Sequence, residues 1–458
     1  MKKIMKKILI VMVSMLFITA CSTELDQVPP NQVDADNISD YEPVLVAAYS
    51  YHYDAIHTMP VLGDFRSDDC LFDETPYTDF ADFSGNSITS SMNADFFKPF
   101  YSSLYQSILS ANDVIINSTD ATQVGEAQFV RALAYFKLVQ VFGDVTVNLL
   151  GAPTVEEIAA ADLTRQPKNE VYTNIIIPDL QAAKSALGAS SAANAGGRAT
   201  SNAAQGLLGK VYATMGNYAA AATELGAVIN GAAAAGIALV PDYSMIFGSD
   251  NNWNSEILFA TAQSSSAVIP GATRTEIIGN WYAGKNTKAD DGAPLSADLI
   301  AAFAASAGDL RTALTLNGET ASVKYDSGSY TDMNWIELRL TDVIMLYAEA
   351  LNETTNSGGG ESASILALLD PIRTRAGLGS LSGTASTQAE VRQAILDERR
   401  LEFACEGLRW FDLVRFDAAS PGILDAEMGK TINSSYHVFP VPVTEVTSFD
   451  EIIQNEGY

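Results

Sequence analysis

The stretch that decides the fold runs from Ser201 to Ile229 and reads SNAAQGLLGKVYATMGNYAAAATELGAVI. Apolar residues recur three and four positions apart on both sides of a central glycine–asparagine turn, which is the spacing of two helices that each bury one face. Gly209 and Ala221 are small, so the helix backbones can approach there, while Tyr212 and Leu225 can fill the groove between them. The stretch therefore predicts a pair of antiparallel helices.

The spacing of these small and large residues matches the tetratricopeptide pattern, in which such helix pairs stack into a superhelix. Gln205 stands where the repeat usually has tryptophan, so the match is partial. Helical periodicity also predicts helices over residues 40–56, 96–117, 125–141, 169–187, 338–352, 361–376 and 387–406. Pro178 is expected to bend or interrupt the helix at 169–187. The predicted fold class is mainly α, with helical repeats at about 96–236 and 338–416.

Two stretches lack this periodicity and predict a loop-rich lobe. Residues 64–93 and 237–337 are rich in turn-forming and polar residues. Long aperiodic stretches inside a helical protein usually carry function. We therefore expect a single globular domain over 41–458, whose irregular lobe faces a ligand.

The N-terminus has the three parts of a bacterial lipoprotein signal. Lysines at positions 2, 3, 6 and 7 precede an apolar run over 8–18, and the sequence ITAC at 18–21 resembles a lipobox. We predict a signal peptide at 1–20, lipidation of Cys21 and a flexible, proline-bearing tether over 21–40. The acyl chains would anchor the protein, since no later segment is apolar and long enough to span a bilayer.

The formal net charge of −28 excludes some classes of partner. Such an acidic chain repels phosphate backbones, which argues against nucleic acid. Besides Cys21, only Cys70 and Cys405 are present, and a bridge between them cannot be inferred from sequence. The three histidines (His52, His57 and His437) are too scattered for a metal cluster.

Six groups of residues stand in a fixed order along the rest of the chain. They are FVRALAYF at 129–136 with FGDV at 142–145, GRAT at 197–200, LRL at 338–340 with YAEALN at 347–352, IRTRAGL at 372–378, ERRLEF at 398–403 with EGLRWFDL at 406–413, and FPVP at 439–442 with QNEGY at 454–458. Together they resemble the motifs of the SusD/RagB family, and the resemblance extends from the lipobox to Tyr458.

The resemblance implies a helical, tetratricopeptide-like fold with a loop-rich second lobe. It also implies a lipid-anchored protein on the outer face of the outer membrane, which acts as a lid over a SusC-like TonB-dependent transporter. Members of the family bind oligosaccharides, or in some cases peptides, without chemistry of their own. We therefore expect a cell-surface glycan-binding protein that is not an enzyme and has no cofactor, with peptide ligands as the alternative.

Glu398 and Glu402 lie four residues apart on one predicted helix, so both carboxylates share a face that points inward. One interpretation is the general acid/base pair of a glycoside hydrolase. The other is a structural network in which arginines neutralise buried acids, and we favour it because unpaired buried carboxylates are costly. A third hypothesis is a tetratricopeptide scaffold that binds only proteins.

An acidic segment offers weak calcium candidates at Asp68, Asp69 and Asp73, near Asp64 and Glu74. Calcium prefers several oxygen ligands at flexible spacing, but the ordered EF-hand pattern is missing. A solvated acidic loop is the interpretation we favour.

Two aromatic clusters could bind the apolar face of a sugar ring. The first has Trp281 and Tyr282 beside the polar residues Asn280 and Lys285, and the second comprises Tyr77, Phe80 and Phe83. Alternatively, Trp281 pins its loop to the core, as buried tryptophans do. Trp335 and Trp410 are expected to be structural.

Overall fold

The computed structural model describes residues 40–83, 89–263, 278–286, 288–290, 292–318, 320–325 and 333–458. Residues Glu42–Tyr458 form one compact unit. The predicted signal peptide, Cys21 and the tether up to residue 39 lie outside the described residues. Within the described ranges, no helix combines the length and the apolar character needed to cross a membrane.

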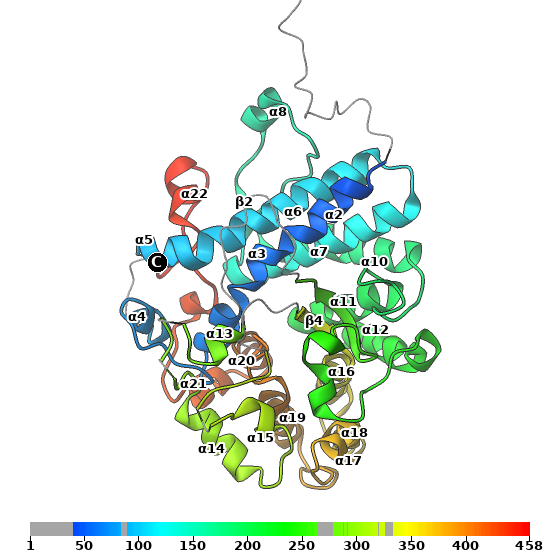
Figure 1. Cartoon of the computed structure of the whole chain (residues 1–458), viewed down its shortest axis with the longest axis vertical. Helices are drawn as coiled ribbons and strands as arrows, with labels where there is room; N and C mark the ends of the chain where they lie inside the picture. Colours follow the sequence, from blue (N-terminus) through cyan, green and yellow to red (C-terminus); the bar gives the residue numbers. More distant parts are fainter. Residues whose placement is uncertain are drawn as a thin grey trace, which may run out of the picture. The chain divides into compact units, whose positions relative to one another are not determined.

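Long helices laid side by side form the first part of this unit (Figure 1). They are α2 (Glu42–Ser50), α3 (His52–Ile56), α6 (Lys98–Asn117) and α7 (Ala121–Phe142), with α6 packed against the other three. Asp120 begins α7 by accepting hydrogen bonds from the next backbone N–H groups, as an N-cap does. Gly143 ends α7 with a φ of 71°, which glycine adopts without a steric penalty.

The helix pair predicted from 201–229 is confirmed as α11 (Ser201–Thr214) and α12 (Tyr218–Gly231), which pack against each other. A Cβ atom at Gly209 would lie 2.5 Å from the side chain of Leu225, so the crossing accommodates only glycine. Ala221 and Leu225 are fully buried and Tyr212 is half-buried. Small residues therefore set the helix spacing, as the sequence predicts.

The interruption predicted at Pro178 is also confirmed. The segment divides into α9 (Lys168–Val171), a π-helical turn (Tyr172–Ile176) and α10 (Ile177–Ala186), with Pro178 in the first turn of α10. Because proline has no N–H, it cannot donate to the carbonyl four residues earlier. The turn before it therefore leaves the α-helical pattern.

The helices continue as a stack through the second half of the chain. α10 packs on α7 and α11, and α12 packs on α16 (Leu340–Thr355), which in turn contacts α19. The other helices here are α17 (Ser362–Ala367), α18 (Asp370–Arg375), α19 (Gln388–Phe403), α20 (Arg409–Ala419), α21 (Ile423–Met428) and α22 (Val443–Ser448). This arrangement is the mainly α fold that the sequence predicts.

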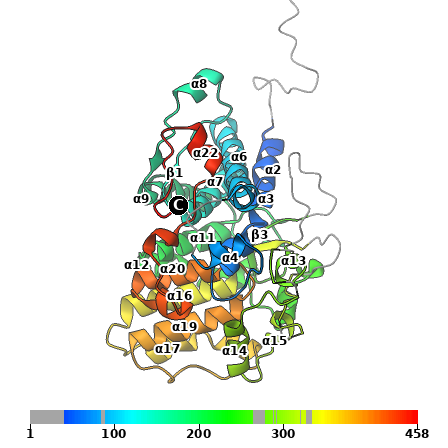
Figure 2. The same ribbon diagram turned by 90° about the vertical axis from the view of Figure 1, so that its left-hand side faces the viewer.

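Two small antiparallel sheets join distant segments. β1 (Val145–Thr146) pairs with β2 (Arg165–Gln166), and β3 (Ile257–Thr261) pairs with β4 (Trp335–Arg339). Between β1 and β2 the chain forms α8 (Val155–Ala160), which stands out beyond α6 in both views (Figures 1 and 2). The helix predicted from residue 338 begins only at Leu340, because residues 338 and 339 complete β4.

Short elements separated by loops make up the two aperiodic stretches. They are α4 (Tyr77–Ala81), α5 (Ser90–Met92), α13 (Gly279–Tyr282), α14 (Ala297–Ala305) and α15 (Thr312–Thr315), with π-helical turns at Val61–Phe65 and Asn93–Phe97 and 3₁₀ turns at Tyr243–Ile246 and Ser249–Asn251. Further 3₁₀ turns lie at Ala233–Ala235 and Ser434–His437. Bridges from Cys70 to Leu295 and from Phe72 to Ala289 tie the two stretches together.

Candidate ligand pocket

The rings predicted to form an exposed platform lie in the core instead. Trp281 and Tyr282 are fully buried, and Tyr77 and Phe80 are nearly so. The ring of Trp281 packs against those of Phe65, Phe72 and Phe96, with centroids 5.6 to 6.3 Å apart. The platform prediction is wrong, because these large rings are what attach the short, aperiodic segments to the helices. The alternative, that Trp281 pins its loop to the core, is confirmed.

The remaining members of the two clusters do not form a common site either. Asn280 is half-buried, Lys285 is exposed, and neither lines the pocket described below. The half-buried ring of Phe83 lies against the guanidinium of Arg66, whose Cζ is 3.9 Å from the ring centroid. Trp335 and Trp410 are buried, as predicted for structural residues.

The acidic segment divides into buried and exposed carboxylates. Asp69 is buried and the side chain of Asp68 is only 4% exposed, and they accept hydrogen bonds from Arg400 and Arg409, respectively, each at 2.8 Å. Asp73 is exposed. In the described part of the chain, no group of three or more His, Cys, Asp or Glu side chains could hold a metal ion. The interpretation as a solvated loop therefore holds for Asp73 and Glu74 but is wrong for Asp64, Asp68 and Asp69, and arginines pair with the last two.

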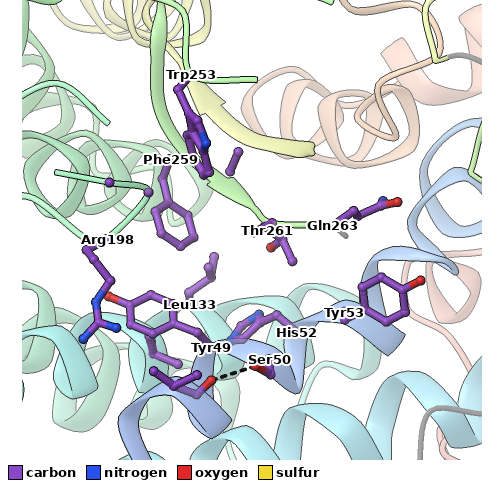
Figure 3. Close-up of a pocket in the computed structure, with 16 residues that line it drawn as sticks. Tyr49, Ser50, His52, Tyr53, Leu133, Arg198, Trp253, Phe259, Thr261 and Gln263 are labelled. Carbon is purple, nitrogen blue, oxygen red and sulfur yellow. Dashed lines mark hydrogen bonds between the residues drawn. The ribbon is translucent and has the colours of Figure 1, made fainter. Parts of the chain in front are cut away.

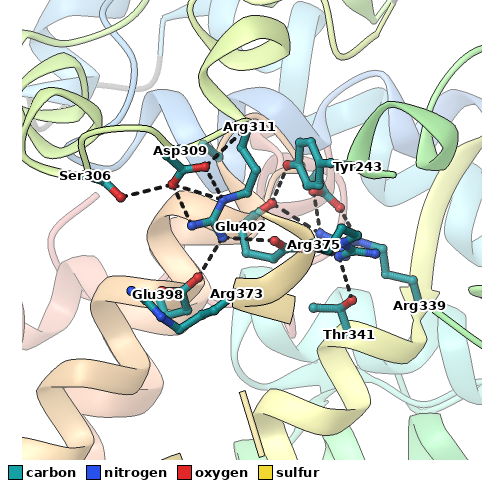
Figure 4. Close-up of polar contacts among 12 residues, drawn as sticks. Tyr243, Ser306, Asp309, Arg311, Arg339, Thr341, Arg373, Arg375, Glu398 and Glu402 are labelled. Atoms are coloured by element: carbon teal, nitrogen blue, oxygen red, sulfur yellow. Dashed lines mark hydrogen bonds and ion pairs between the residues drawn. The ribbon is translucent and has the colours of Figure 1, made fainter. Parts of the chain in front are cut away.

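Glu398 and Glu402 belong to a buried network of ion pairs (Figure 4). Arg311 donates to Glu398 at 2.8 Å and to Glu402 at 3.0 Å, and it also pairs with Asp309. Glu402 accepts further hydrogen bonds from Arg339 at 2.8 Å and from Arg375 at 2.6 Å. A second cation, Arg373, pairs with Glu398.

These arginines control the protonation of Glu402. Burial alone would raise the pKa of this carboxyl, but the guanidinium groups of Arg375, Arg339 and Arg311 hold the pKa well below its usual range. A glycosidase general acid needs the opposite shift, since it must carry a proton near neutral pH. The structural interpretation of the glutamate pair is confirmed.

Cys70 and Cys405 are buried, free thiols. They lie close enough that the Cys405 thiol, together with burial, raises the pKa of Cys70 well above its usual value. Cys405 was expected inside the helix at 387–406. Instead α19 ends at Phe403, and Cys405 has a φ of 64° in the following loop.

A pocket of about 260 Å³ lies where α2, α3 and α7 face the 196–198 loop and the end of β3 (Figure 3). Its lining is mostly apolar, with a few polar side chains among aromatic rings. The residues labelled there are Tyr49, Ser50, His52, Tyr53, Leu133, Arg198, Trp253, Phe259, Thr261 and Gln263. This combination is typical of sites for small molecules, and the volume lies just below their usual range of about 300–1,000 Å³.

Trp253 is held on one wall of the pocket by the glycine beneath it. The half-buried indole packs against Ala192, Ile257 and Ala260, and a Cβ at Gly197 would come within 2.6 Å of the ring. Gly197 also has a φ of 82°, which other residues rarely adopt. Gly197 of the GRAT motif therefore shapes this wall.

The polar side chains of the opposite wall form hydrogen bonds and ion pairs with neighbouring carboxylates. Tyr49 donates its hydroxyl to Glu126 at 2.7 Å, and Arg198 donates to the same carboxylate at 2.6 Å. Arg198 also pairs with Glu42 at 3.0 Å. Burial and the negative charge of Glu126 raise the pKa of Tyr49 well above its usual value, so the hydroxyl stays protonated. This wall is thus a fixed surface, in which one arginine pairs with two carboxylates.

His52 differs from these residues because its ring nitrogens are unsatisfied. The side chain is buried at the pocket floor, and neither nitrogen has a partner in full hydrogen-bond geometry among the described residues. The carbonyl of Val130 lies close enough to favour the protonated ring, but burial outweighs this effect. Burial, together with the charge of Lys137, holds the pKa of His52 well below its usual value, so the ring is neutral. A neutral imidazole offers one donor and one acceptor to a ligand.

The sequence predicts only some of the residues that line this pocket. Trp253, Thr261 and Gln263 come from the stretch at 237–337, which was expected to face a ligand. The other half comes from α2 and α3, where Tyr49, His52 and Tyr53 look like ordinary residues of amphipathic helices. Only the fold brings the two sets together.

Comparisons with known proteins agree with this architecture. A family model described as the SusD family matches residues 243–458, and one described as "Starch-binding associating with outer membrane" matches residues 25–213. SusD-like protein P2 of Formosa agariphila is 28% identical over 419 residues, which cover 78% of this chain and 80% of that protein.

Solved structures share the fold. A SusD superfamily protein from Bacteroides thetaiotaomicron has a TM-score of 0.74 at 19% identity, covering 93% of this chain and 99% of the other. A laminarin-binding SusD-like protein has a TM-score of 0.65 at 23% identity, covering 91% and 99%. With matching family models over most of its length and this common fold, the chain belongs to the SusD/RagB family.

Proposed function

We propose that this protein binds oligosaccharides at the cell surface without chemistry of its own and delivers them to a SusC-like TonB-dependent transporter. The observation that carries the proposal is the pocket between α2 and β3, with Trp253 on its wall and His52 on its floor. A pyranose ring has an apolar C–H face that stacks on an indole or phenol, and hydroxyl groups that pair with neutral donors and acceptors. The relatives described as starch- and laminarin-binding support a glycan ligand.

The chemical character of the pocket favours binding over catalysis. No carboxylate pair from the described residues lines it, and the inward pair Glu398 and Glu402 is bound by arginines elsewhere. Arg198 and Tyr49 are engaged with Glu126 and hold no reactive proton near neutral pH. A small site of this kind suits micromolar or weaker affinity, which permits capture followed by release.

The test is isothermal titration calorimetry of the mature protein against laminarin oligosaccharides, malto-oligosaccharides and short peptides. We expect at least one oligosaccharide to bind, and Trp253→Ala to weaken that binding about tenfold, the loss of roughly 1.4 kcal/mol. Leu310→Ala is the matched control, because Leu310 is an exposed apolar residue that does not line the pocket.

Absence of binding to every sugar by a folded protein would contradict the proposal, and binding of peptides alone would favour the peptide alternative. Cleavage of any of the oligosaccharides, followed by chromatography, would contradict the non-catalytic role.

The proposed location rests on a lipid at Cys21 and a tether over 21–40. Several acyl chains on one residue anchor a folded domain stably. We expect metabolic labelling with a fatty acid to mark the protein, Cys21→Ser to abolish the label, and external protease to reach the anchored protein on intact cells. Recovery of the wild-type protein without the label, or only inside the periplasm, would contradict the anchor or the orientation. Co-purification with the transporter from solubilised outer membranes tests the partnership.

A further inference from the structure

The segments that contain α8 and α22 lie at one end of the ribbon (Figure 2), and exposed apolar side chains are frequent in them. In the described part of the chain, twelve large apolar side chains are exposed, and six of them lie in residues 147–164 and 441–458. They are Leu149, Val155, Ile158, Val443, Phe449 and Ile453. We call these two segments the α8/α22 surface. Half of the exposed large apolar side chains thus lie in two short segments. Single exposed apolar residues are normal, but such a concentration indicates an interaction surface.

The two segments form one continuous surface. Leu149, Ile158 and Phe449 line the same groove of about 580 Å³, which opens between α8 and α22 above the rings of Tyr101 and Tyr105. On α8, residues 155 and 158 are three positions apart and so share one face of the helix. Val155 is 78% exposed and Ile158 is 57% exposed, so this apolar face has no covering among the described residues.

The short helix is held firmly although its apolar face is open. Thr154 and Glu157 form a reciprocal capping box at its start, and each accepts a backbone hydrogen bond from the other's residue. At the base of this segment, Thr146 of β1 donates to the carbonyl of Leu163 at 2.8 Å and so ties the two ends of the segment together. The surface is therefore preformed, which reduces the entropic cost of binding a partner.

The two segments carry acidic side chains only, and the cation beside them is Arg165, which donates to the carbonyl of Ile453 at 2.6 Å. Residues 147–164 and 441–458 contain seven acidic side chains and no lysine or arginine. The seven are Glu156, Glu157, Asp162, Glu445, Asp450, Glu451 and Glu456, of which all but the half-buried Glu445 are exposed. The surface thus has an apolar centre and an acidic rim. Protein interfaces usually have an apolar centre and a polar rim, and an acidic rim favours a partner with basic residues.

This layout selects among the occupants of the groove. A second copy would bring the same acids face to face, and like charges across an interface are costly. Membranes with anionic head groups would be repelled for the same reason. We propose that the α8/α22 surface docks a protein segment with apolar side chains flanked by lysine or arginine. The proposal is independent of the ligand that the pocket near Trp253 binds.

The test is photo-crosslinking of the full-length lipoprotein in its own outer membrane. A photoreactive amino acid is placed at position 158 or 453, and at position 310 as the control, since Leu310 is 62% exposed and lies outside both segments. We expect positions 158 and 453, but not 310, to crosslink to one protein, and sequencing of the joined peptide to show an apolar segment with basic residues beside it.

Charge and contact variants then test the recognition itself. We expect the triple variant Glu156→Gln, Asp450→Asn, Glu451→Gln to lower the yield from position 453 about tenfold, and Val155→Ser to do the same from position 158. Asp298→Asn, an exposed acid outside the surface, should leave both yields unchanged. Crosslinks to lipid, to a second copy or to a segment without basic residues would overturn the proposal, as would yields equal to that at position 310. Melting temperatures equal to wild type show that the variants are folded.

Discussion

Two regions of the protein bury polar side chains, and they treat them in opposite ways. Around α19, Glu402 receives hydrogen bonds from three arginines, and the surrounding charges are paired in turn. In the pocket between α2 and β3, His52 is just as buried but has no hydrogen-bond partner among the described residues. A buried polar group normally finds partners, because leaving it unpaired costs about 1–3 kcal/mol.

The difference shows how to separate structural from functional polar residues. In the network around α19 every charged group is paired with an opposite charge, so the network fixes how α19, α18 and β4 pack, although Nε of Arg375 is buried without a partner among the described residues. In the pocket, an unsatisfied imidazole faces open volume beside aromatic rings. Acidic residues alone therefore do not identify the site of this protein, whereas an unsatisfied polar group beside a cavity does.

The largest effect is expected from breaking the network. Glu402→Ala leaves Arg311, Arg339 and Arg375 buried with fewer counter-charges, and removing one partner of a buried ion pair typically costs about 3–5 kcal/mol. Urea denaturation measures the free energy of unfolding. Asp397→Ala on the same helix is the control, because Asp397 is exposed and such changes usually stay within about 0.5 kcal/mol.

A conservative variant separates this effect from catalysis. Glu402→Gln, if it folds, should bind the oligosaccharide as tightly as wild type. If folded Glu402→Gln loses oligosaccharide binding, or loses a sugar-cleaving activity that wild type shows, the network is part of the ligand site and is not purely structural.

The next effect concerns a buried acid that has no arginine. Asp64 accepts hydrogen bonds from the Tyr282 hydroxyl at 2.7 Å and from the Gly407 N–H at 2.8 Å. Burial and the neighbouring Asp69 raise the pKa of Asp64 to about 7. The unfolded chain loses this proton near pH 4, so between pH 4 and 7 the folded state binds more protons and stability falls as the pH rises. The total loss is up to about 4 kcal/mol.

The difference between wild type and Asp64→Asn isolates this contribution from other carboxyls. We expect wild type to lose stability relative to Asp64→Asn from pH 4 to pH 7, and the difference to level off above pH 7. Asp73→Asn, an exposed acid of the same segment, should show no such trend. A difference that does not change with pH would mean that Asp64 is ionised throughout, and that its hydrogen bonds outweigh its burial.

The features that the sequence predicts are those whose interacting residues lie close together along the chain. The α11–α12 pair is predictable because Gly209 and Leu225 meet across a short turn, and the break at Pro178 because proline acts on its own helix turn. The network around Glu402 was expected from the number of arginines, although its partner Arg311, in an aperiodic loop, was not.

The pocket was not predictable, because its two halves come from segments that are not helical neighbours. The glycine-rich stretch around Trp281 favours an exposed ligand residue, yet such a stretch has few other apolar residues to attach it to the core, so Trp281 is buried. Trp253 is left half-exposed by contrast, because Gly197 and Ala192 beneath it are too small to enclose the ring. The distinction depends on contacts between distant parts of the chain.

A smaller effect is expected at the glycine beneath Trp253. Gly197→Ala introduces a Cβ within 2.6 Å of the indole at a φ of 82°. A non-glycine residue in this left-handed region costs about 1–2 kcal/mol, and the indole must also move. We expect a lower melting temperature and weaker oligosaccharide binding. Gly383→Ala is the matched control: its φ of 84° carries a similar strain, nothing lies within 4 Å of its Cβ and it does not line the pocket, so it should lower stability without weakening binding. Equal losses of binding in the two variants would mean that Trp253 takes no part.

The smallest change in stability, and the sharpest separation of the two regions, is expected at His52. His52→Leu removes a buried polar group without partners, so stability at pH 7 should stay equal or rise by about 1 kcal/mol. Because the pKa of His52 is held low in the folded state while the unfolded chain binds a proton near pH 6.5, wild type should lose stability relative to His52→Leu as the pH falls below 6.5.

Binding of the oligosaccharide to His52→Leu should nevertheless be several-fold weaker, because the variant offers no donor or acceptor at the pocket floor. A variant that is as stable as wild type and binds less tightly identifies a residue kept for its ligand. If His52→Leu binds normally, the imidazole is not a ligand contact. If it is strongly destabilised instead, the imidazole has a structural partner and His52 belongs with the satisfied residues of the network.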